Sequence, residues 1–202
     1  MRIDVITLFP EIFASITDYG ISARAMKRGL WNIHFWNPRD VTEDVHRTVD
    51  DRPFGGGPGM VMMAEPLAKT LEYVRASGNS GPVIAFSPTG ERLTDAYVRS
   101  FSSQPAGQMV LVCGRYEGID ERFLETYVDH TVSLGDFVLS GAELAACALI
   151  DAVVRQLPGA IKELSASDES FSTGLLDAPH YTRPEVWRGK GVPEVLLSLI
   201  HI

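Results

Sequence analysis

Glycine-marked turns that follow strand-like runs are the features of this chain best suited to hold a ligand. An apolar, β-rich run at residues 109–113 breaks at a glycine-bounded turn, 114–118 (GRYEG), and a second turn, 133–136 (SLGD), precedes Ser140 and Gly141. Glycine lets main-chain N–H and C=O groups approach a flat ligand such as adenine. Because turns at the ends of neighbouring strands can meet, the pattern predicts one pocket lined largely by backbone.

The elements that must position these turns alternate between strand and helix. Strands are expected at residues 3–8, 30–36, 83–86, 109–113 and 131–134, and helices at 10–16, 66–74, 94–101, 120–127 and 141–154. This alternation predicts an α/β fold with a mainly parallel sheet covered on both faces. The last helix carries almost no charge apart from Glu143 and Asp151, so we expect it deep in the core or in an interface.

Length and composition indicate one large domain, or one domain with an appendage. The chain has 202 residues, of which 45% are hydrophobic and 22% charged, as is ordinary for a globular protein with a substantial core. Neither a membrane-spanning run nor a secretory leader is evident. Cys113 and Cys147 lie in apolar runs, as buried reduced thiols do. We therefore expect a cytoplasmic protein without a membrane partner.

The formal charge of −8 argues against non-specific nucleic-acid binding, although a local basic patch remains compatible with it. Several common chemistries are excluded by their motifs. The strict Gly-x-Gly-x-x-Gly dinucleotide fingerprint, a zinc-like Cys/His spacing and a Gly-x-Ser-x-Gly nucleophile turn are all missing from the sequence.

Three segments interrupt the alternation. Residues 37–59 are too long, charged and glycine-rich for an ordinary connection, which is typical of a functional loop. Residues 158–181, rich in small and acidic side chains, are expected to form a linker or lid. Residues 195–202 end the chain in an apolar stretch, from which we expect a truncated C-terminus.

Short motifs in a fixed order connect the chain with a known family. They are residues 8–11 (LFPE), 36–40 (WNPRD), 48–60 (TVDDRPFGGGPGM), 112–121 (VCGRYEGIDE), 135–139 with Gly141 and Glu143-Leu144, 149–152 (LIDA) and 179–185 (PHYTRPE). On these motifs the chain resembles the bacterial tRNA (guanine-N1)-methyltransferases, the TrmD family of the SPOUT class, from residue 3 to about residue 198. The resemblance implies a deep trefoil knot over roughly residues 83–155, within the cofactor-binding domain.

The resemblance also implies an activity and a domain plan. The family transfers a methyl group from S-adenosylmethionine to N1 of the guanosine 3′-adjacent to the anticodon (position 37) in tRNA. It works as a homodimer whose active sites take residues from both chains. By this analogy residues 1–160 form the knotted methyltransferase domain, 161–180 a flexible linker, and 181–202 the start of a truncated tRNA-binding domain.

The cofactor-binding residues implied by the resemblance lie in three loops. They are Phe86, Ser87 and Pro88; Gly114, Tyr116, Glu117 and Gly118; and Ser133, Leu134, Gly135, Phe137, Val138, Leu139, Gly141 and Ala142. Ala142 replaces the second of the family's paired glycines, so its methyl group either crowds the cofactor or packs on the helix. Glu117 either helps to hold Mg²⁺, on which the family's activity generally depends, or caps a turn.

The chemistry of guanine methylation requires a base and a cation. Guanine N1 bears a proton at neutral pH, so a carboxylate must accept it and a cation must stabilise the charge on O6. The resemblance implies that Arg155 is this cation. Without the resemblance, Arg155 would be interpreted as a basic residue at the C-terminus of a helix, where the helix dipole favours a positive charge. The resemblance assigns the base to Glu169, where the family usually has Asp, with Asp168 as the alternative. The expected RNA-binding residues are His46, Asp50, Arg52 and Gly59, with Arg24 and Arg183 as further phosphate contacts.

Two other functions stay open at this point. The substitution at Glu169 and the apparent loss of most of the C-terminal domain favour a catalytically weak or silent dimeric module that binds S-adenosylmethionine or RNA. The acidic charge is compatible with a small-molecule α/β enzyme that uses the same pocket.

Overall fold

The computed structural model describes residues 1–103, 107–161, 170–171 and 176–197. It separates into two compact units, Met1–Ala166 and Ser167–Ile202. Each unit is described by itself. No helix in the described part of the chain is long and apolar enough to cross a membrane.

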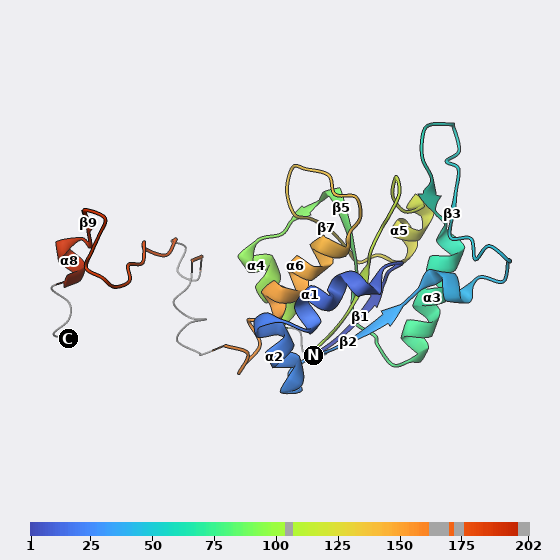
Figure 1. Cartoon of the computed structure of the whole chain (residues 1–202). Helices are drawn as coiled ribbons and strands as arrows, with labels where there is room; N and C mark the ends of the chain where they lie inside the picture. Colours follow the sequence, from blue (N-terminus) through green and yellow to red (C-terminus); the bar gives the residue numbers. More distant parts are fainter. Residues whose placement is uncertain (104–106, 162–169, 172–175, 198–202) are drawn as a thin grey trace. The chain divides into compact units, whose positions relative to one another are not determined.

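The first unit is built on a five-stranded sheet in the order β2-β1-β6-β5-β7 (Figure 1). Its strands are β1 (Arg2–Ile6), β2 (Asn32–Trp36), β5 (Val83–Arg92), β6 (Gln108–Val112) and β7 (His130–Ser133). Every neighbouring pair is parallel, which confirms the predicted mainly parallel α/β fold.

Strand β5 differs from its prediction, which ended at Phe86. The strand continues to Arg92, and its register with β7 shifts between Phe86 and Glu91. Residues 87–90 carry no apolar alternation and have no partner in β7, because Phe86 and Glu91 both pair with Val132. The shift sends this segment out of the regular ladder at the edge where the pocket lies.

Helices surround the sheet. They are η1 (Pro10–Phe13), α1 (Ala14–Thr17), α2 (Gly20–Lys27), η2 (Pro38–Val41), α3 (Ala64–Ala76), α4 (Asp95–Ser102), α5 (Glu121–Tyr127) and α6 (Glu143–Val154). The predicted helices are confirmed with shifted ends, and Thr94 caps α4 by accepting a hydrogen bond from the Tyr97 backbone N–H at 3.3 Å. The long loop also contains β3 (Asp50–Asp51), which pairs antiparallel with β4 (Val61–Met62).

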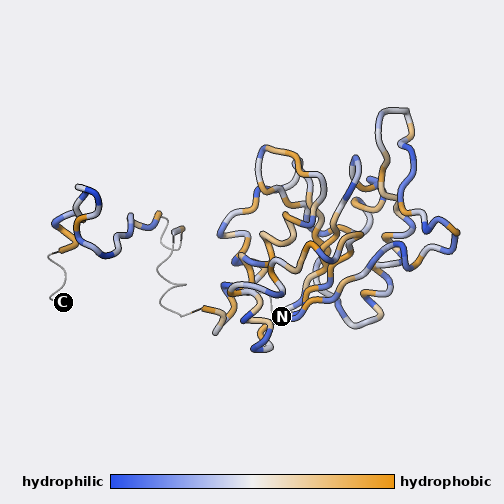
Figure 2. The backbone as a smooth tube through the Cα atoms, viewed as in Figure 1, coloured by the Kyte–Doolittle hydropathy of each residue, from blue (hydrophilic) through white to orange (hydrophobic). Residues whose placement is uncertain are grey.

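Alternating side chains of the strands fill two hydrophobic clusters, one on each face of the sheet. In β6, Met109 and Leu111 pack with residues of α4 and α6, whereas Val110 and Val112 pack with residues of α3 and α5. Figure 2 shows hydrophobic residues gathered along the strands and the helices beside them. Most of α6 is buried in the first cluster, which confirms its predicted place in the core.

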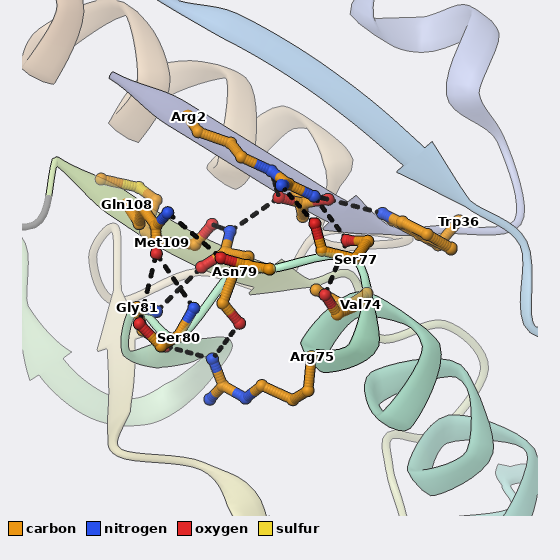
Figure 3. A network of polar contacts seen from close by, with 12 residues as sticks. Arg2, Trp36, Val74, Arg75, Ser77, Asn79, Ser80, Gly81, Gln108 and Met109 are labelled. Carbon is orange, nitrogen blue, oxygen red and sulfur yellow. Dashed lines mark hydrogen bonds and ion pairs between the residues drawn. The ribbon is translucent and has the colours of Figure 1, made fainter.

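A buried carboxylate organises the amino-terminal edge of the sheet (Figure 3). Asp4 is fully buried and accepts hydrogen bonds from Arg2 Nε at 2.7 Å, Trp36 Nε1 at 2.7 Å and Asn79 Nδ2 at 2.6 Å. Burial raises the pKa of Asp4, but these hydrogen bonds and the charge of Arg2 outweigh it, so the pKa lies below its ordinary value. This network joins β1, β2 and the segment before β5.

The second unit contains a small antiparallel pair, β8 (Val186–Trp187) with β9 (Lys190–Gly191), followed by α8 (Glu194–Leu197). The guanidinium of Arg188 lies 4.9 Å from the centre of the Trp187 ring. The hydrogen bond from His180 lowers the pKa of Asp177, which is exposed.

Candidate active site

A cavity of about 400 Å³ opens at the carboxyl ends of β5, β6 and β7. Its walls are the segment after Phe86, the turn that follows β6, and the long turn between β7 and α6. Parallel strands present their carboxyl ends at one edge of the sheet, where open α/β sheets bind their ligands. The volume falls in the range of small-molecule sites.

Every residue predicted to contact the cofactor lines this cavity. They are Phe86, Ser87, Pro88, Gly114, Tyr116, Glu117, Gly118, Ser133, Leu134, Gly135, Phe137, Val138, Leu139, Gly141 and Ala142. Ala142 is also buried in the first hydrophobic cluster, so its methyl group has core neighbours as well as a place at the cavity wall.

The turn after β6 lines the cavity and has an unusual backbone conformation. Tyr116 has φ 60°, a left-handed value that residues other than glycine rarely adopt, and Gly118 has φ 132°. The turn is held by the Glu117 backbone N–H, which donates to the Met60 carbonyl at 2.9 Å. Such strain persists only where surrounding contacts maintain it, and it is common at ligand sites.

Asp50, one of the predicted RNA-binding residues, faces the same turn. Burial raises the pKa of Tyr116, and the charge and hydrogen bond of Asp50 raise it further. The Tyr116 hydroxyl also accepts a hydrogen bond from Arg39 Nη2 at 3.3 Å. The long loop that follows β2 is therefore connected to the cavity wall through Tyr116.

Gly59, another predicted RNA-binding residue, touches Glu117. A Cβ atom at residue 59 would lie 2.4 Å from Glu117 Oε1, and Gly59 has φ +81°. Both the space and the backbone conformation therefore require glycine at this position. No group of three or more His, Cys, Asp or Glu side chains suited to a metal ion occurs in the described ranges, and the role of Glu117 in Mg²⁺ binding stays a prediction.

The other predicted RNA-binding residues are not among those that line the cavity. His46 and Arg52 are exposed on the segment that also contains Asp50. Arg24 is exposed on α2, and Arg183 is exposed in the second unit. The structure therefore brings Asp50 and Gly59 to the predicted cofactor turn and does not bring Arg24 to it.

Arg155 stands at the C-terminal end of α6, where its backbone N–H donates to the Asp151 carbonyl at 3.1 Å. The residues of α6 that line the cavity, such as Ala145, lie at the other end of the helix. A helix of 12 residues is about 18 Å long. Arg155 is thus not among the residues that line the cavity of its own chain. Glu169 and Asp168 lie outside the described residues.

The structure adds Arg115 and Glu143 to the residues at the site. Arg115 lines the cavity, and its Nη2 pairs with Glu143 Oε2 at 2.9 Å. The sequence contained a signal for this pair, because an acidic residue at the start of a nearly uncharged helix needs a cation or a strong donor when it is buried. Sequence alone does not show which cation that is.

The parallel sheet, its cavity at the carboxyl edge and its backbone-lined turns define an α/β enzyme that binds a small cofactor. The family model described as tRNA (guanine-1)-methyltransferase matches residues 1–202. The chain belongs to the tRNA (guanine-1)-methyltransferase (TrmD) family, which confirms the family predicted from the motifs.

Named relatives agree with this membership. The tRNA (guanine-N(1)-)-methyltransferase of Thiobacillus denitrificans is 59% identical over 206 residues, covering 100% of this chain and 86% of the relative. The enzyme of the same name from Stutzerimonas stutzeri is 57% identical, covering 100% of this chain and 80% of the relative. Among solved structures, the tRNA (m1G37) methyltransferase of Aquifex aeolicus matches with a TM-score of 0.83 at 39% identity, covering 100% of this chain and 84% of that one.

Proposed function

We propose that this chain transfers a methyl group from S-adenosylmethionine to N1 of the guanosine at position 37 of tRNA, 3′-adjacent to the anticodon. The observation that carries the proposal is the cavity at the carboxyl edge of the sheet, in a chain that belongs to the tRNA (guanine-1)-methyltransferase family. No finding favours the catalytically silent module.

The cavity fits S-adenosylmethionine by its size and its lining. The turns that contain Gly114, Gly118 and Gly135 line the cavity, where glycine lets the main chain approach a flat adenine, and apolar side chains such as Phe137 and Leu139 line the same space. When bound, the cofactor supplies a sulfonium methyl group that needs correct placement and no further activation. The residues predicted to hold it are those of the three loops.

Glu169 and Arg155 supply the remaining chemistry in this proposal. The carboxylate of Glu169 accepts the N1 proton of guanine, and the guanidinium of Arg155 stabilises the negative charge that develops on O6. Asp168 is the alternative base. His46, Asp50, Arg52 and Gly59 handle the guanosine and its neighbours, and Arg24 and Arg183 contact phosphates.

A homodimer explains how Arg155 can serve a cavity at the other end of its own helix. Arg155 lies about 15 Å along α6 from Ala145, which lines the cavity. A second copy could bring its Arg155 to that cavity. Leu144 is 58% exposed and Ala148, one turn further along the same face of α6, is exposed too, which supports an apolar contact between chains.

Three further assignments belong to the same proposal. Glu117 contributes to Mg²⁺ binding, for which a carboxylate oxygen is a suitable ligand. The knot lies within residues 83–155, the range that contains β5, β6, β7 and α6. Residues 1–160 form the methyltransferase domain, residues 161–180 a linker and residues 181–202 part of a tRNA-binding domain; the compact unit Met1–Ala166 supports the first boundary.

The test is methyl transfer from labelled S-adenosylmethionine to two unmodified tRNA transcripts, one with guanosine and one with adenosine at position 37. We expect label on the guanosine transcript alone. Arg155→Ala and Glu169→Ala should lose transfer but keep cofactor binding, whereas Asp168→Ala should keep both. Label on neither transcript, with cofactor binding retained, would support the silent module instead.

The shared site is tested by mixing inactive chains. Arg155→Ala lacks the cation that stabilises O6. Gly118→Val is expected to distort the cofactor-binding turn, because Gly118 has φ 132°, which valine rarely adopts. In a mixed dimer, the Arg155→Ala chain supplies an intact cavity and the Gly118→Val chain supplies an intact Arg155, so one of the two sites is complete. Activity of the mixture, with neither variant active alone, is expected; an inactive mixture in which mixed dimers have formed would contradict the shared site.

A further inference from the structure

A buried ion pair connects two of the loops that form the cavity. Arg115 belongs to the turn after β6, and Glu143 begins α6 two residues after Gly141. The two side chains meet at 2.9 Å between Nη2 and Oε2. Arg115 Nη1 also donates to the Ser140 carbonyl at 3.3 Å. The guanidinium of Arg115, which belongs to the first loop, therefore contacts two residues at the end of the second loop.

Residues after β1 add further contacts to this ion pair. Glu143 is only 1% exposed, and its Oε1 accepts a hydrogen bond from Thr7 Oγ1 at 2.9 Å. Thr7 in turn accepts from the Phe9 backbone N–H at 3.0 Å, and the Arg115 guanidinium lies 4.4 Å from the centre of the Phe9 ring. The first turn of α6 also favours an anion, because helix N-termini carry partial positive charge.

Gly141 leaves the space that the guanidinium occupies. A Cβ atom at residue 141 would lie 2.3 Å from Arg115 Nε and 2.5 Å from its Cδ and Cζ. Next to it, the Ala142 backbone N–H donates to the Gly114 carbonyl at 3.0 Å, so the two loops also touch through their main chains. The position of Arg115 and the shape of the cavity wall are thus linked.

We propose that Arg115 and Glu143 are positioning residues for methyl transfer, which hold the turn after β6 and the turn before α6 at the separation that the cofactor requires. This inference rests on the proposed function for the identity of the cofactor. Without the pair, the two loops keep the main-chain hydrogen bond between Ala142 and Gly114 but lose the side-chain contacts that connect Arg115 with Ser140 and Glu143. Small displacements of groups that place a substrate can lower the rate about 100-fold.

The test compares Glu143→Gln and Arg115→Lys with the wild-type chain by calorimetric titration of S-adenosylmethionine and by thermal unfolding. Glu143→Gln keeps the shape but removes the charge, and Arg115→Lys keeps the charge but loses the planar fork. We expect the dissociation constant to rise about 10-fold or more in both, in line with the 10- to 100-fold effects of residues that orient ligand-binding groups. In transfer assays, KM for the cofactor should rise more than kcat falls.

Asp4→Asn is the matched control, because Asp4 is an equally buried carboxylate paired with an arginine and does not line the cavity. It should lower thermal stability and leave the dissociation constant for S-adenosylmethionine unchanged. If Asp4→Asn weakens cofactor binding as much as Glu143→Gln does, the pair acts through stability alone and the proposal is wrong.

A second variant separates positioning from folding. Replacing both partners with apolar residues of similar size, Arg115→Met with Glu143→Leu, removes the buried charges together and often restores stability. We expect this chain to unfold near the wild-type temperature and still bind S-adenosylmethionine about 10-fold more weakly. Wild-type binding by this folded double variant would overturn the proposal. Because the readout is cofactor binding without tRNA, the result does not depend on whether the wild-type chain transfers the methyl group.

Discussion

Replacing Asp4 with asparagine tests whether the network at the amino-terminal edge holds the sheet together. The change keeps the shape of the side chain but removes its charge and turns one acceptor oxygen into a donor. Arg2, Trp36 and Asn79 all donate to this carboxylate, so at least one donor must lose its acceptor. The amide that replaces the oxygen would also face another N–H group.

The expected loss follows from burial and charge. Removing one partner of a buried ion pair costs about 3–5 kcal/mol. The Asp4 side chain is fully buried but that of Arg2 is 23% exposed and can recover some hydration, which places the loss at the low end, about 3 kcal/mol. Urea unfolding at pH 7 should therefore show a midpoint lower by about 1–2 M, given the slopes typical of such proteins.

The pH dependence gives the stronger test. The pKa of Asp4 in the folded chain lies below its ordinary value. A depressed folded pKa means that the ionised group stabilises the fold above the unfolded pKa, and that this contribution is lost as pH falls through the folded pKa. The difference in unfolding free energy between wild type and Asp4→Asn should be constant from pH 7 to about pH 5 and shrink below the unfolded value. A difference under about 1 kcal/mol at pH 7, or one that grows on acidification, would refute the reasoning.

Other expected outcomes follow from single contacts. Thr94→Ala removes the cap that accepts from Tyr97 N–H and should lower the unfolding free energy by about 1 kcal/mol, whereas Thr94→Ser should restore most of it; equal stability of all three chains would contradict the cap. Gly141→Ala should displace the Arg115 guanidinium and raise the dissociation constant for S-adenosylmethionine, and unchanged binding would show that the side chain moves freely. Burial raises the pKa of Cys113 well above its ordinary value, so Cys113 should resist a thiol reagent at pH 8 until the chain is unfolded, and rapid labelling of the native chain would exclude this burial.

The predicted fold came from patterns that are local in the chain. The predictions of a strand at 109–113 and of a charge-poor helix at 141–154 were correct in type and close in position. Each element is buried, and burial requires a run of apolar residues that is visible in the local sequence. The glycine-marked turns were also correct, since a backbone that must leave a strand sharply depends on the residue at the turn itself. The assignment of the cavity residues came from the family resemblance, and their roles in cofactor binding stay predictions.

Other features could not be derived in this way. The extension of β5 to Arg92 depends on a neighbouring strand, because residues 87–92 lack the alternation that marks a strand by itself. The short strand β3 was missed within the segment 37–59, which has the composition of a loop, and β4 was missed just after that segment. Pairing energy from a partner strand overrides weak local preference in both cases.

By itself the sequence determined the family, the α/β class and the turns that line the cavity, because each of these is carried by residue types at fixed spacing. Only the tertiary structure decided which charges meet. In the sheet order β2-β1-β6-β5-β7, neighbours in space are often distant in the chain, and this order brings Asn79 to Asp4. The turn after β6 brings Arg115 to Glu143 in the same way. A buried carboxylate requires a partner for physical reasons that the sequence reveals, but the identity of that partner is set by which segments the folded chain places side by side.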